Sequence, residues 1–224
     1  MKRSLFAMAA VLSGIFFLLS WVDRNGLYVA EQHFWSVNKK LTQLARDPKA
    51  APDQVYDLLE KDYEKIIKRF PQSILTDRAR LMIGQIYWIK NDWGTARNKW
   101  LAIVQNHPAE KSLCAQALEG VAKTYEAEGK WELSEGVYRQ IIKDYGTTEV
   151  GWKAPLQLVA QYQQRGQTSE AQTALQEAMA HYRQQARTHM GTEEELSALR
   201  MLANAYLLKE DWQSLSRHQA PSNL

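Results

Sequence analysis

The sequence contains few cysteines, glycines and prolines, the residues that form disulfides and tight turns. Its 224 residues include one cysteine, Cys114, so neither an internal disulfide nor a CxxC metal or redox motif can form. Only 11 glycines and 6 prolines occur, and long stretches of alternating β-branched residues are missing, which disfavours a sandwich or barrel with many tight turns. These absences favour helices, and 45% hydrophobic residues are enough for a packed core.

A strong excess of positive charge is also missing. The chain has 28 lysines and arginines against 25 aspartates and glutamates, which gives a formal net charge of +3. A chain of this size that neutralised many phosphates would carry a larger basic excess. The composition therefore predicts no nucleic-acid partner.

The motifs of common catalytic sites are absent from the sequence. No HExxH, GxSxG, GxxxxGK[ST] or GxGxxG pattern occurs. The histidines are scattered without acidic partners at metal-ligand spacing: His33, His107, His181, His189 and His218. Cys114 lacks a spaced histidine, which favours a buried inert thiol over a nucleophile. We therefore expect no enzyme activity, no cofactor and no metal site.

The first 24 residues combine a short cationic start with a long uncharged stretch. Lys2 and Arg3 precede nineteen residues without a charge, Ser4 to Val22. At about 1.5 Å per helical residue this stretch spans roughly the 30 Å hydrocarbon core of a bilayer. No pair of small residues typical of a cleavage site lies near its end. We predict an uncleaved membrane anchor at residues 4–22, with a cleaved export signal as the alternative.

Beyond residue 25, helical periodicity is interrupted by turn signals at similar distances, which indicates internal repeats. The clearest copy, between residues 77 and 110, contains Ile83-Gly84, Tyr87, Asn91-Asp92-Trp93, Ala96, Trp100 and Pro108. The pattern returns with Val121-Ala122, Tyr125, Gly129-Lys130-Trp131, Tyr138 and Ile141-Ile142, then from Trp152 with Tyr162 and Gly166-Gln167, and near Ser197 with Tyr206 and Asp211-Trp212. Four tyrosines carry the register at intervals of 38, 37 and 44 residues: Tyr87, Tyr125, Tyr162 and Tyr206.

These positions resemble the tetratricopeptide repeat (TPR), whose units are antiparallel helix pairs of about 34 residues. The resemblance covers about residues 53 to 215. It implies an all-α fold class, a TPR-like α-solenoid of antiparallel helix pairs. The uncharged stretch at residues 4–22 adds one N-terminal transmembrane helix before the solenoid. The resemblance also implies that Gly84 lets two helices approach and that Trp100 faces back toward the first helix. The expected domains are the signal-anchor segment 1–24, a helical linker 25–52, the solenoid 53–218 and a tail 219–224.

One short motif restricts the resemblance to part of the family. Phe70-Pro71-Gln72-Ser73, followed by Ala79, Gly84 and Tyr87, is similar to bacterial cell-envelope members such as the outer-membrane assembly lipoprotein and the Tol-Pal-associated coordinator. However, Ile15 follows Leu12-Ser13-Gly14 where a lipoprotein would carry its lipidated cysteine. The resemblance therefore implies the repeat architecture and an envelope location, and it leaves the pathway open.

In this family the first helices of successive repeats line a groove that binds peptides. The resemblance places eight residues in a partner-binding groove: Arg78, Leu81, Gln85, Trp88, Ile89, Glu119, Lys123 and Glu126. An apolar patch at Trp88, beside Arg78 and Lys123, would hold a partner segment through one aromatic anchor and charge-assisted hydrogen bonds. The alternative is that Trp88 packs in the core between repeats.

Together these features predict a membrane-tethered, non-enzymatic scaffold or adaptor that binds or assembles proteins in the bacterial cell envelope. Positive charge before the anchor places the solenoid on the periplasmic side of the inner membrane, whereas signal cleavage would leave an exported soluble protein. The last repeat breaks off near Arg217 without a polar capping helix, so contact with a partner or a second copy is expected. The alternative function is an accessory module of a polysaccharide or peptidoglycan machine, with Trp93, Trp131 and Trp152 stacking on sugars.

Overall fold

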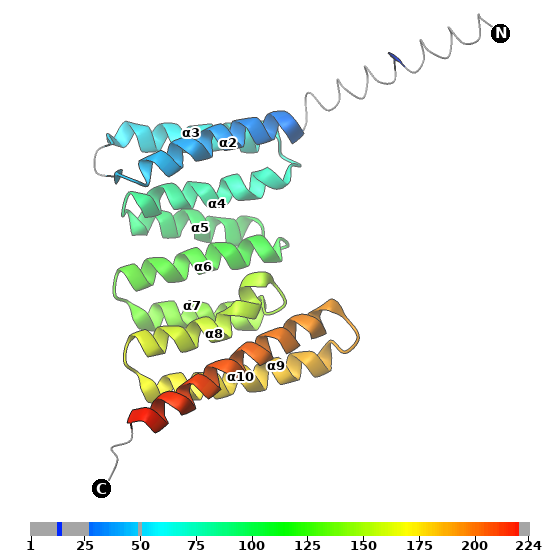
Figure 1. Ribbon diagram of the computed structural model, residues 1–224. Helices are drawn as coiled ribbons and strands as arrows, with labels where there is room; N and C mark the ends of the chain where they lie inside the picture. Colours follow the sequence, from blue (N-terminus) through cyan, green and yellow to red (C-terminus); the bar gives the residue numbers. More distant parts are fainter. Residues whose placement is uncertain (1–12, 15–26, 49–50, 220–224) are drawn as a thin grey trace, which may run out of the picture. The chain divides into compact units, whose positions relative to one another are not determined.

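In the computed structural model, regular secondary structure is entirely helical. The structure describes residues 13–14, 27–48 and 51–219. From residue 27 onward, these ranges contain nine helices and no strand (Figure 1): α2 (Leu27–Leu44), α3 (Asp53–Arg69), α4 (Ile74–Ile89), α5 (Trp93–Asn106), α6 (Lys111–Ala127), α7 (Trp131–Asp144), α8 (Glu149–Gln164), α9 (Thr168–Thr188) and α10 (Glu193–Gln219). The predicted all-α fold class is confirmed for this part of the chain. Two compact units divide it, Met1–Trp100 and Leu101–Leu224, so α5 begins in the first and ends in the second.

The first unit has a core formed by α2, α3 and α4, and consecutive helices run in opposite directions (Figure 1). Buried side chains of α2 recur at helical spacing: Ala30, Phe34, Val37, Leu41 and Leu44. Phe34 meets Tyr63 of α3 edge to face, with ring centroids 5.9 Å apart. The segment expected to be a helical linker, residues 25–52, thus contributes a core helix, because α2 carries an apolar face that α3 and α4 cover.

The close approach of α4 and α5 depends on a glycine. A Cβ at Gly84 would lie 2.3 Å from Nε1 of Trp100 and 2.4 Å from its Cε2, far inside contact distance. The Trp100 ring therefore occupies the space that any side chain at Gly84 would need, and its Nε1 donates a hydrogen bond to the Leu81 carbonyl oxygen at 3.1 Å. The predicted roles of Gly84 and Trp100 in this helix pair are confirmed.

The repeat tyrosine of α4 is tied to the preceding helix. The Tyr87 hydroxyl donates to the carboxylate of Glu60 on α3, and Lys99 Nζ of α5 lies 2.5 Å from the same carboxylate. The Lys99 ammonium also lies 5.6 Å from the Tyr87 ring centroid. Burial would raise the pKa of Glu60, but the hydrogen bonds from Lys99 and Tyr87 outweigh it and lower that pKa. An ionised Glu60 therefore joins three successive helices.

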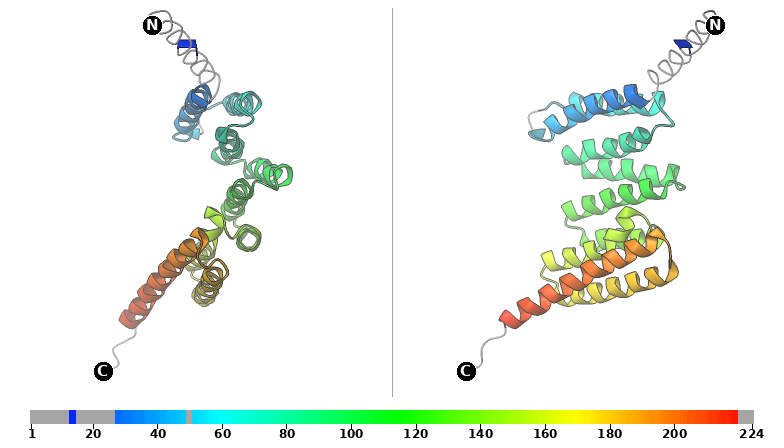
Figure 2. Two further views of the ribbon diagram at one scale, coloured as in Figure 1. Left: turned by 90° about the vertical axis from the view of Figure 1, so that its right-hand side faces the viewer. Right: turned by 45° about the vertical axis from the view of Figure 1, so that its right-hand side comes forward.

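The second unit contains the end of α5 and helices α6 to α10. Each of these five helices packs on the next, and α8 contacts both α6 and α10 (Figure 2). The core between them includes large buried side chains: Leu118, Trp131, Tyr138, Ile141, Trp152, Leu158, Tyr162 and Tyr182. The Tyr182 hydroxyl donates to the Trp152 carbonyl oxygen at 2.8 Å, which joins α9 to α8.

Three predicted turns after first helices are present. The residues that end them have positive φ angles, Asn91 (61°), Gly129 (71°) and Gly166 (71°). Glycine and asparagine adopt this left-handed conformation with the least steric cost, which explains their choice at these sites. In each case the next helix begins two residues later.

The fourth repeat does not follow the predicted pattern. A turn was expected at Asp211-Trp212, but α10 continues without a break from Glu193 to Gln219. The sequence around this position contains neither glycine nor proline and is rich in good helix formers, so nothing local ends the helix. The chain therefore ends its packed part with one long helix instead of a fourth helix pair.

The predicted membrane anchor, residues 4–22, lies outside the described residues except for Ser13 and Gly14. None of the helices in the described ranges is both long and apolar enough to cross a bilayer. The anchor therefore stays a prediction from the sequence.

Candidate functional site

The predicted groove residues are divided between the two units. Five of them lie on α4 in the first unit, where Arg78 is exposed and the others are half-buried: Leu81, Gln85, Trp88 and Ile89. Ile89 packs against the core of that unit. Trp88 belongs to neither the fully buried core nor the exposed apolar surface, so both interpretations of this side chain stay open.

The three predicted residues on α6 have different surroundings. Lys123 Nζ lies 2.7 Å from Glu119 Oε1 one helical turn away, so these two charges neutralise each other at the surface. Glu126 accepts a hydrogen bond at 3.2 Å from the hydroxyl of Ser134, which is fully buried on α7. Glu126 is thus engaged in holding α6 to α7, whereas Glu119 and Lys123 are available at the surface.

Glu119 lines a groove between α6 and α8 with a volume of about 230 Å³. Its other walls are formed by Gln116, Tyr138, Glu149, Val150, Lys153, Ala154 and Gln157. On the α8 side, Lys153 Nζ lies 2.6 Å from Glu149 Oε1, which repeats the ion pair of the α6 side. Because both charged pairs are internally balanced, the groove presents mainly amide groups over a small apolar floor. Such a surface suits the alternating donors and acceptors of a peptide backbone.

A buried hydroxyl lies beneath this groove. Tyr138 is 1% exposed, and its hydroxyl forms no well-aligned hydrogen bond, with Glu126 and Gln157 as its polar neighbours. Burial first and then the nearby Glu126 carboxylate raise the pKa of Tyr138 well above its usual range, so the phenol stays neutral. A neutral phenol keeps the groove floor uncharged.

Two of the three tryptophans considered for sugar stacking are unavailable. Trp131 is 8% exposed, its ring covered by the Arg165 guanidinium at 4.2 Å and by the edge of Tyr162 at 5.3 Å. Trp152 is 6% exposed and packs in the core of the second unit. Both residues fill the interface between helices, as aromatic side chains at helical spacing commonly do. Neither of these two rings is exposed for stacking on a sugar, whereas the third, Trp93, is half-buried.

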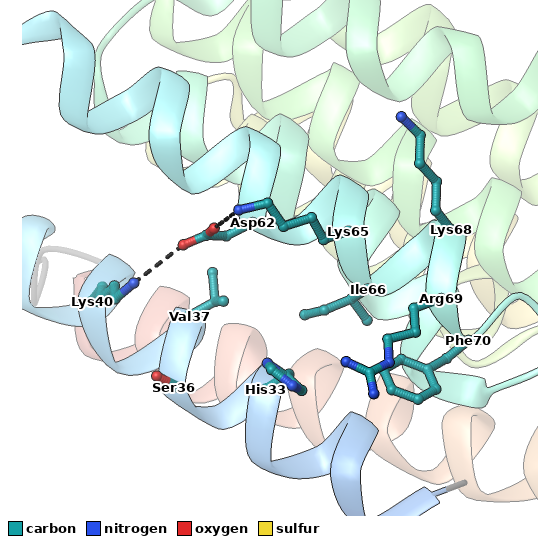
Figure 3. A pocket seen from close by; sticks show the side chains of 10 residues that line it. All are labelled: His33, Ser36, Val37, Lys40, Asp62, Lys65, Ile66, Lys68, Arg69 and Phe70. Carbon is teal, nitrogen blue, oxygen red and sulfur yellow. Dashed lines mark hydrogen bonds and ion pairs between the residues drawn. The ribbon is translucent and has the colours of Figure 1, made fainter. Parts of the chain in front are cut away.

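A cavity lies between α2 and α3, and no sequence pattern predicted it. Its volume is about 630 Å³, and residues of both helices line it (Figure 3). A cavity of about 330 Å³ between α7, α8 and α9 was likewise missed; it contains His181, whose buried Nε2 has no hydrogen-bond partner. Desolvation lowers the pKa of His181. Both cavities depend on how helices pair, which residue periodicity does not reveal.

The outer face of α10 is apolar. Its large exposed side chains include Leu196 (68%) and Leu207 (61%), together with Leu199 and Tyr206. The Tyr206 hydroxyl accepts a hydrogen bond from Arg183 of α9 at 2.6 Å, so this tyrosine lies at the rim and not between two helices of a pair. An exposed apolar face at the end of the repeats was expected from the sequence.

Chemically reactive groups are sparse in this structure. Cys114 is fully buried, and its thiol donates to the His107 carbonyl oxygen at 3.1 Å. The predicted burial of Cys114 is confirmed, and this burial raises the pKa of the thiol. Among the described residues, no group of three histidine, cysteine or acidic side chains is arranged to hold a metal ion. In comparisons with known proteins, the chain matches no protein-family model and no curated protein.

Proposed function

We propose that the protein is a non-enzymatic adaptor, a TPR-like α-solenoid that binds protein partners in the bacterial cell envelope and is tethered to the inner membrane. The observation that carries this proposal is the groove between α6 and α8 in the second unit. These two helices are the first members of successive helix pairs, and they contact each other directly. In repeat proteins of this type, the first helices form the surface that receives a partner segment.

The chemistry of the groove supports a peptide as the ligand. Gln116 of α6 and Gln157 of α8 contribute amide groups, and Val150 and Ala154 of α8 are apolar lining residues. The rim charges are paired within each helix, so a ligand needs no net charge of its own. Hydrogen bonding to a partner main chain, with one small apolar contact, is the recognition mode that fits this lining.

The proposal is tested by photo-crosslinking from the groove. A photoreactive amino acid replaces Lys153 at the groove rim in the tagged full-length protein, and Gln176, an exposed residue of α9 that lines no described groove, serves as the matched position. Irradiation in the native membranes, followed by mass spectrometry, should give a reproducible envelope protein from position 153 only. Equal cross-linking from both positions would remove this groove from consideration.

Affinity for the purified partner then tests the amide groups. Replacing Gln116 and Gln157 together by alanine should weaken binding about tenfold, since each lost hydrogen bond contributes about 0.5–1.5 kcal/mol. The matched control replaces the exposed glutamines Gln172 and Gln176 of α9, which should leave the affinity unchanged. Circular dichroism at 222 nm should be the same for both double variants, because all four side chains lie at the surface or the groove wall.

The membrane tether is tested separately. If residues 4–22 form an uncleaved anchor, mass spectrometry of the purified protein should detect the intact N-terminal peptide, and alkaline carbonate should not extract the protein from membranes. Protease added to spheroplasts should degrade the helical part, because the proposal places it outside the cytoplasm. A processed N-terminus near residue 22 would replace the tether with an exported soluble form and leave the adaptor proposal standing.

A further inference from the structure

A groove between α2 and α3 in the first unit has walls of a different chemistry from the groove of the second unit. His33, Val37 and Lys40 of α2 face Asp62, Ile66 and Arg69 of α3 across it (Figure 3). The α2 residues follow one helix face over two turns, so the groove is roughly 10 Å long at 1.5 Å per residue. Its volume of about 630 Å³ is in the range that receives a bulky side chain and the chain around it.

The floor of the groove is apolar, and the end formed by Lys40, Asp62 and Lys65 is basic. Val37 and Ile66 lie in the centre of the view in Figure 3, and both are buried against the core on their other side. At one end a single carboxylate, that of Asp62, is shared by Lys40 Nζ at 3.2 Å and Lys65 Nζ at 2.9 Å. Two cations against one anion leave a net positive charge at this end.

The carboxylate of this triad stays ionised. Burial would raise the pKa of Asp62, but the hydrogen bonds from Lys65 and Lys40 outweigh that effect and lower it. Both lysines remain partly exposed, so each retains donor capacity for a second carboxylate. The Asp62 carboxylate thus holds two ammonium groups at the groove edge, and its single negative charge does not neutralise both of them.

The other end of the groove is basic because it carries the guanidinium of Arg69. The Arg69 guanidinium lies 5.4 Å from the centroid of the Phe70 ring and forms no ion pair within the described residues. Figure 3 shows Arg69, Phe70 and His33 gathered at this end, whereas Lys68 extends away from them. A guanidinium held over an aromatic ring presents its planar donors for a carboxylate.

We propose that this groove binds an acidic peptide segment of a protein partner, with one apolar side chain on Val37 and Ile66 and carboxylates at both basic ends. The two ends are about 10 Å apart, a separation reached by acidic residues two helical turns apart or three residues apart in an extended strand. An apolar recess between two separated cationic ends matches such a segment better than a flat lipid surface or an evenly charged nucleic acid backbone. The surface is separate from the α6–α8 groove and extends the adaptor function to a second, acidic class of ligand.

Fluorescence polarisation with defined peptides tests this proposal on the full-length protein in detergent. Three fluorescein-labelled ten-residue peptides share a central leucine and phenylalanine, which are flanked on each side by four glutamates, four glutamines or four lysines. The glutamate peptide should bind at least tenfold more tightly than the glutamine peptide, the lysine peptide should not bind, and added salt should weaken the interaction. Equal affinity for the glutamate and glutamine peptides would overturn the proposal.

Charge-reversal variants assign the binding to the groove. Arg69→Glu should weaken binding of the glutamate peptide at least tenfold, and Arg69→Gln should have a smaller effect in the same direction. Lys61→Glu is the matched control, because Lys61 is exposed on the same helix and does not line the groove. It should change the affinity less than twofold, and circular dichroism should show that all three variants remain folded. Equal losses for Arg69→Glu and Lys61→Glu would refute a specific site.

Two further outcomes would overturn the peptide assignment in favour of another occupant. Arg69-dependent flotation with phosphatidylglycerol vesicles, without competition from the glutamate peptide, would identify an anionic lipid surface as the ligand. Self-association of the full-length protein that Arg69→Glu abolishes would identify a second copy of this chain. Neither outcome bears on the Gln116 and Gln157 substitutions, so the two grooves are tested independently.

Discussion

Replacing Gly84 by alanine tests the packing of α4 on α5 directly. The new methyl carbon would lie 2.3 to 2.6 Å from three atoms of the Trp100 ring, about 1 Å short of ordinary carbon contact distances. Trp100 is 5% exposed and its Nε1 is bonded to the Leu81 carbonyl, so the ring cannot turn away without losing that bond. Either the helices separate or the ring leaves its position.

Two opposing effects set the size of the change in stability. Forcing a methyl group into a filled site costs about 1–3 kcal/mol, and a lost hydrogen bond adds about 1 kcal/mol. Alanine in the middle of a helix gains back about 0.5–1 kcal/mol over glycine. The net expectation is that Gly84→Ala lowers the free energy of unfolding by about 1–3 kcal/mol, measured by urea unfolding followed by circular dichroism.

The chain offers a matched control for this experiment. Gly136 also lies inside a helix, α7, but an added Cβ there would meet nothing within 4 Å. Gly136→Ala should therefore stabilise the protein by about 0.5–1 kcal/mol through helix propensity alone. In a Trp100→Leu background, which removes the ring, Gly84→Ala should lose most of its cost. If Gly84→Ala stabilised the protein as Gly136→Ala does, the argument from the Trp100 contact would be refuted.

Two further predictions concern the second unit. Because desolvation keeps His181 neutral in the folded state, its contribution to stability is complete above the unfolded pKa of about 6.5 and is lost as pH falls below it. Between pH 7 and 5.5 the wild type should therefore lose up to about 1 kcal/mol more than His181→Gln in urea unfolding; parallel pH profiles would contradict this. Thr148 caps α8 by accepting a hydrogen bond from the Gly151 amide at 3.0 Å, so Thr148→Ala should cost about 1 kcal/mol in the same assay. Thr148→Ser keeps the acceptor and should be close to the wild type.

Several features of the fold follow from local sequence signals. The repeat resemblance predicted that Gly84 lets two helices approach, and the Trp100 ring fills the space that a side chain there would need. The repeat pattern placed Asn91, Gly129 and Gly166 in turns, and the structure shows that each has the positive φ angle that glycine and asparagine tolerate. Such signals depend on the conformation of one or two residues, so a single sequence contains them.

Features that depend on the pairing of distant faces could not be predicted in the same way. The groove between α2 and α3 joins residues far apart in the sequence, such as Lys40 and Asp62, which are 22 positions apart, across a connection whose geometry is not encoded by periodicity. The repeat pattern placed Glu126 and Glu119 on the same groove-facing side of their helix. Only the structure shows that the Ser134 hydroxyl of α7 donates a hydrogen bond to Glu126. Spacing along one helix identifies its faces without saying which neighbour covers them.

The last repeat shows where the family pattern misleads. Tyr206 lies at the tyrosine position of the pattern, and yet it is 42% exposed and bonds to Arg183 at the rim. The turn expected after it requires a residue that ends a helix, and none occurs at this point of the sequence. A repeat register therefore identifies equivalent positions, while the local residues decide whether the second helix of a pair forms.

Because Cys114 is buried, the rate at which a thiol reagent labels it reports local opening of the second unit. It is the only thiol in the sequence, it is fully covered, and its pKa is raised, so a thiol reagent reaches it as a thiolate only when α6 separates from its neighbours. The labelling rate under native conditions thus measures how often the second unit opens, with no engineered probe. A ligand that binds the α6–α8 groove would slow this labelling in proportion to its occupancy, whatever its chemical identity.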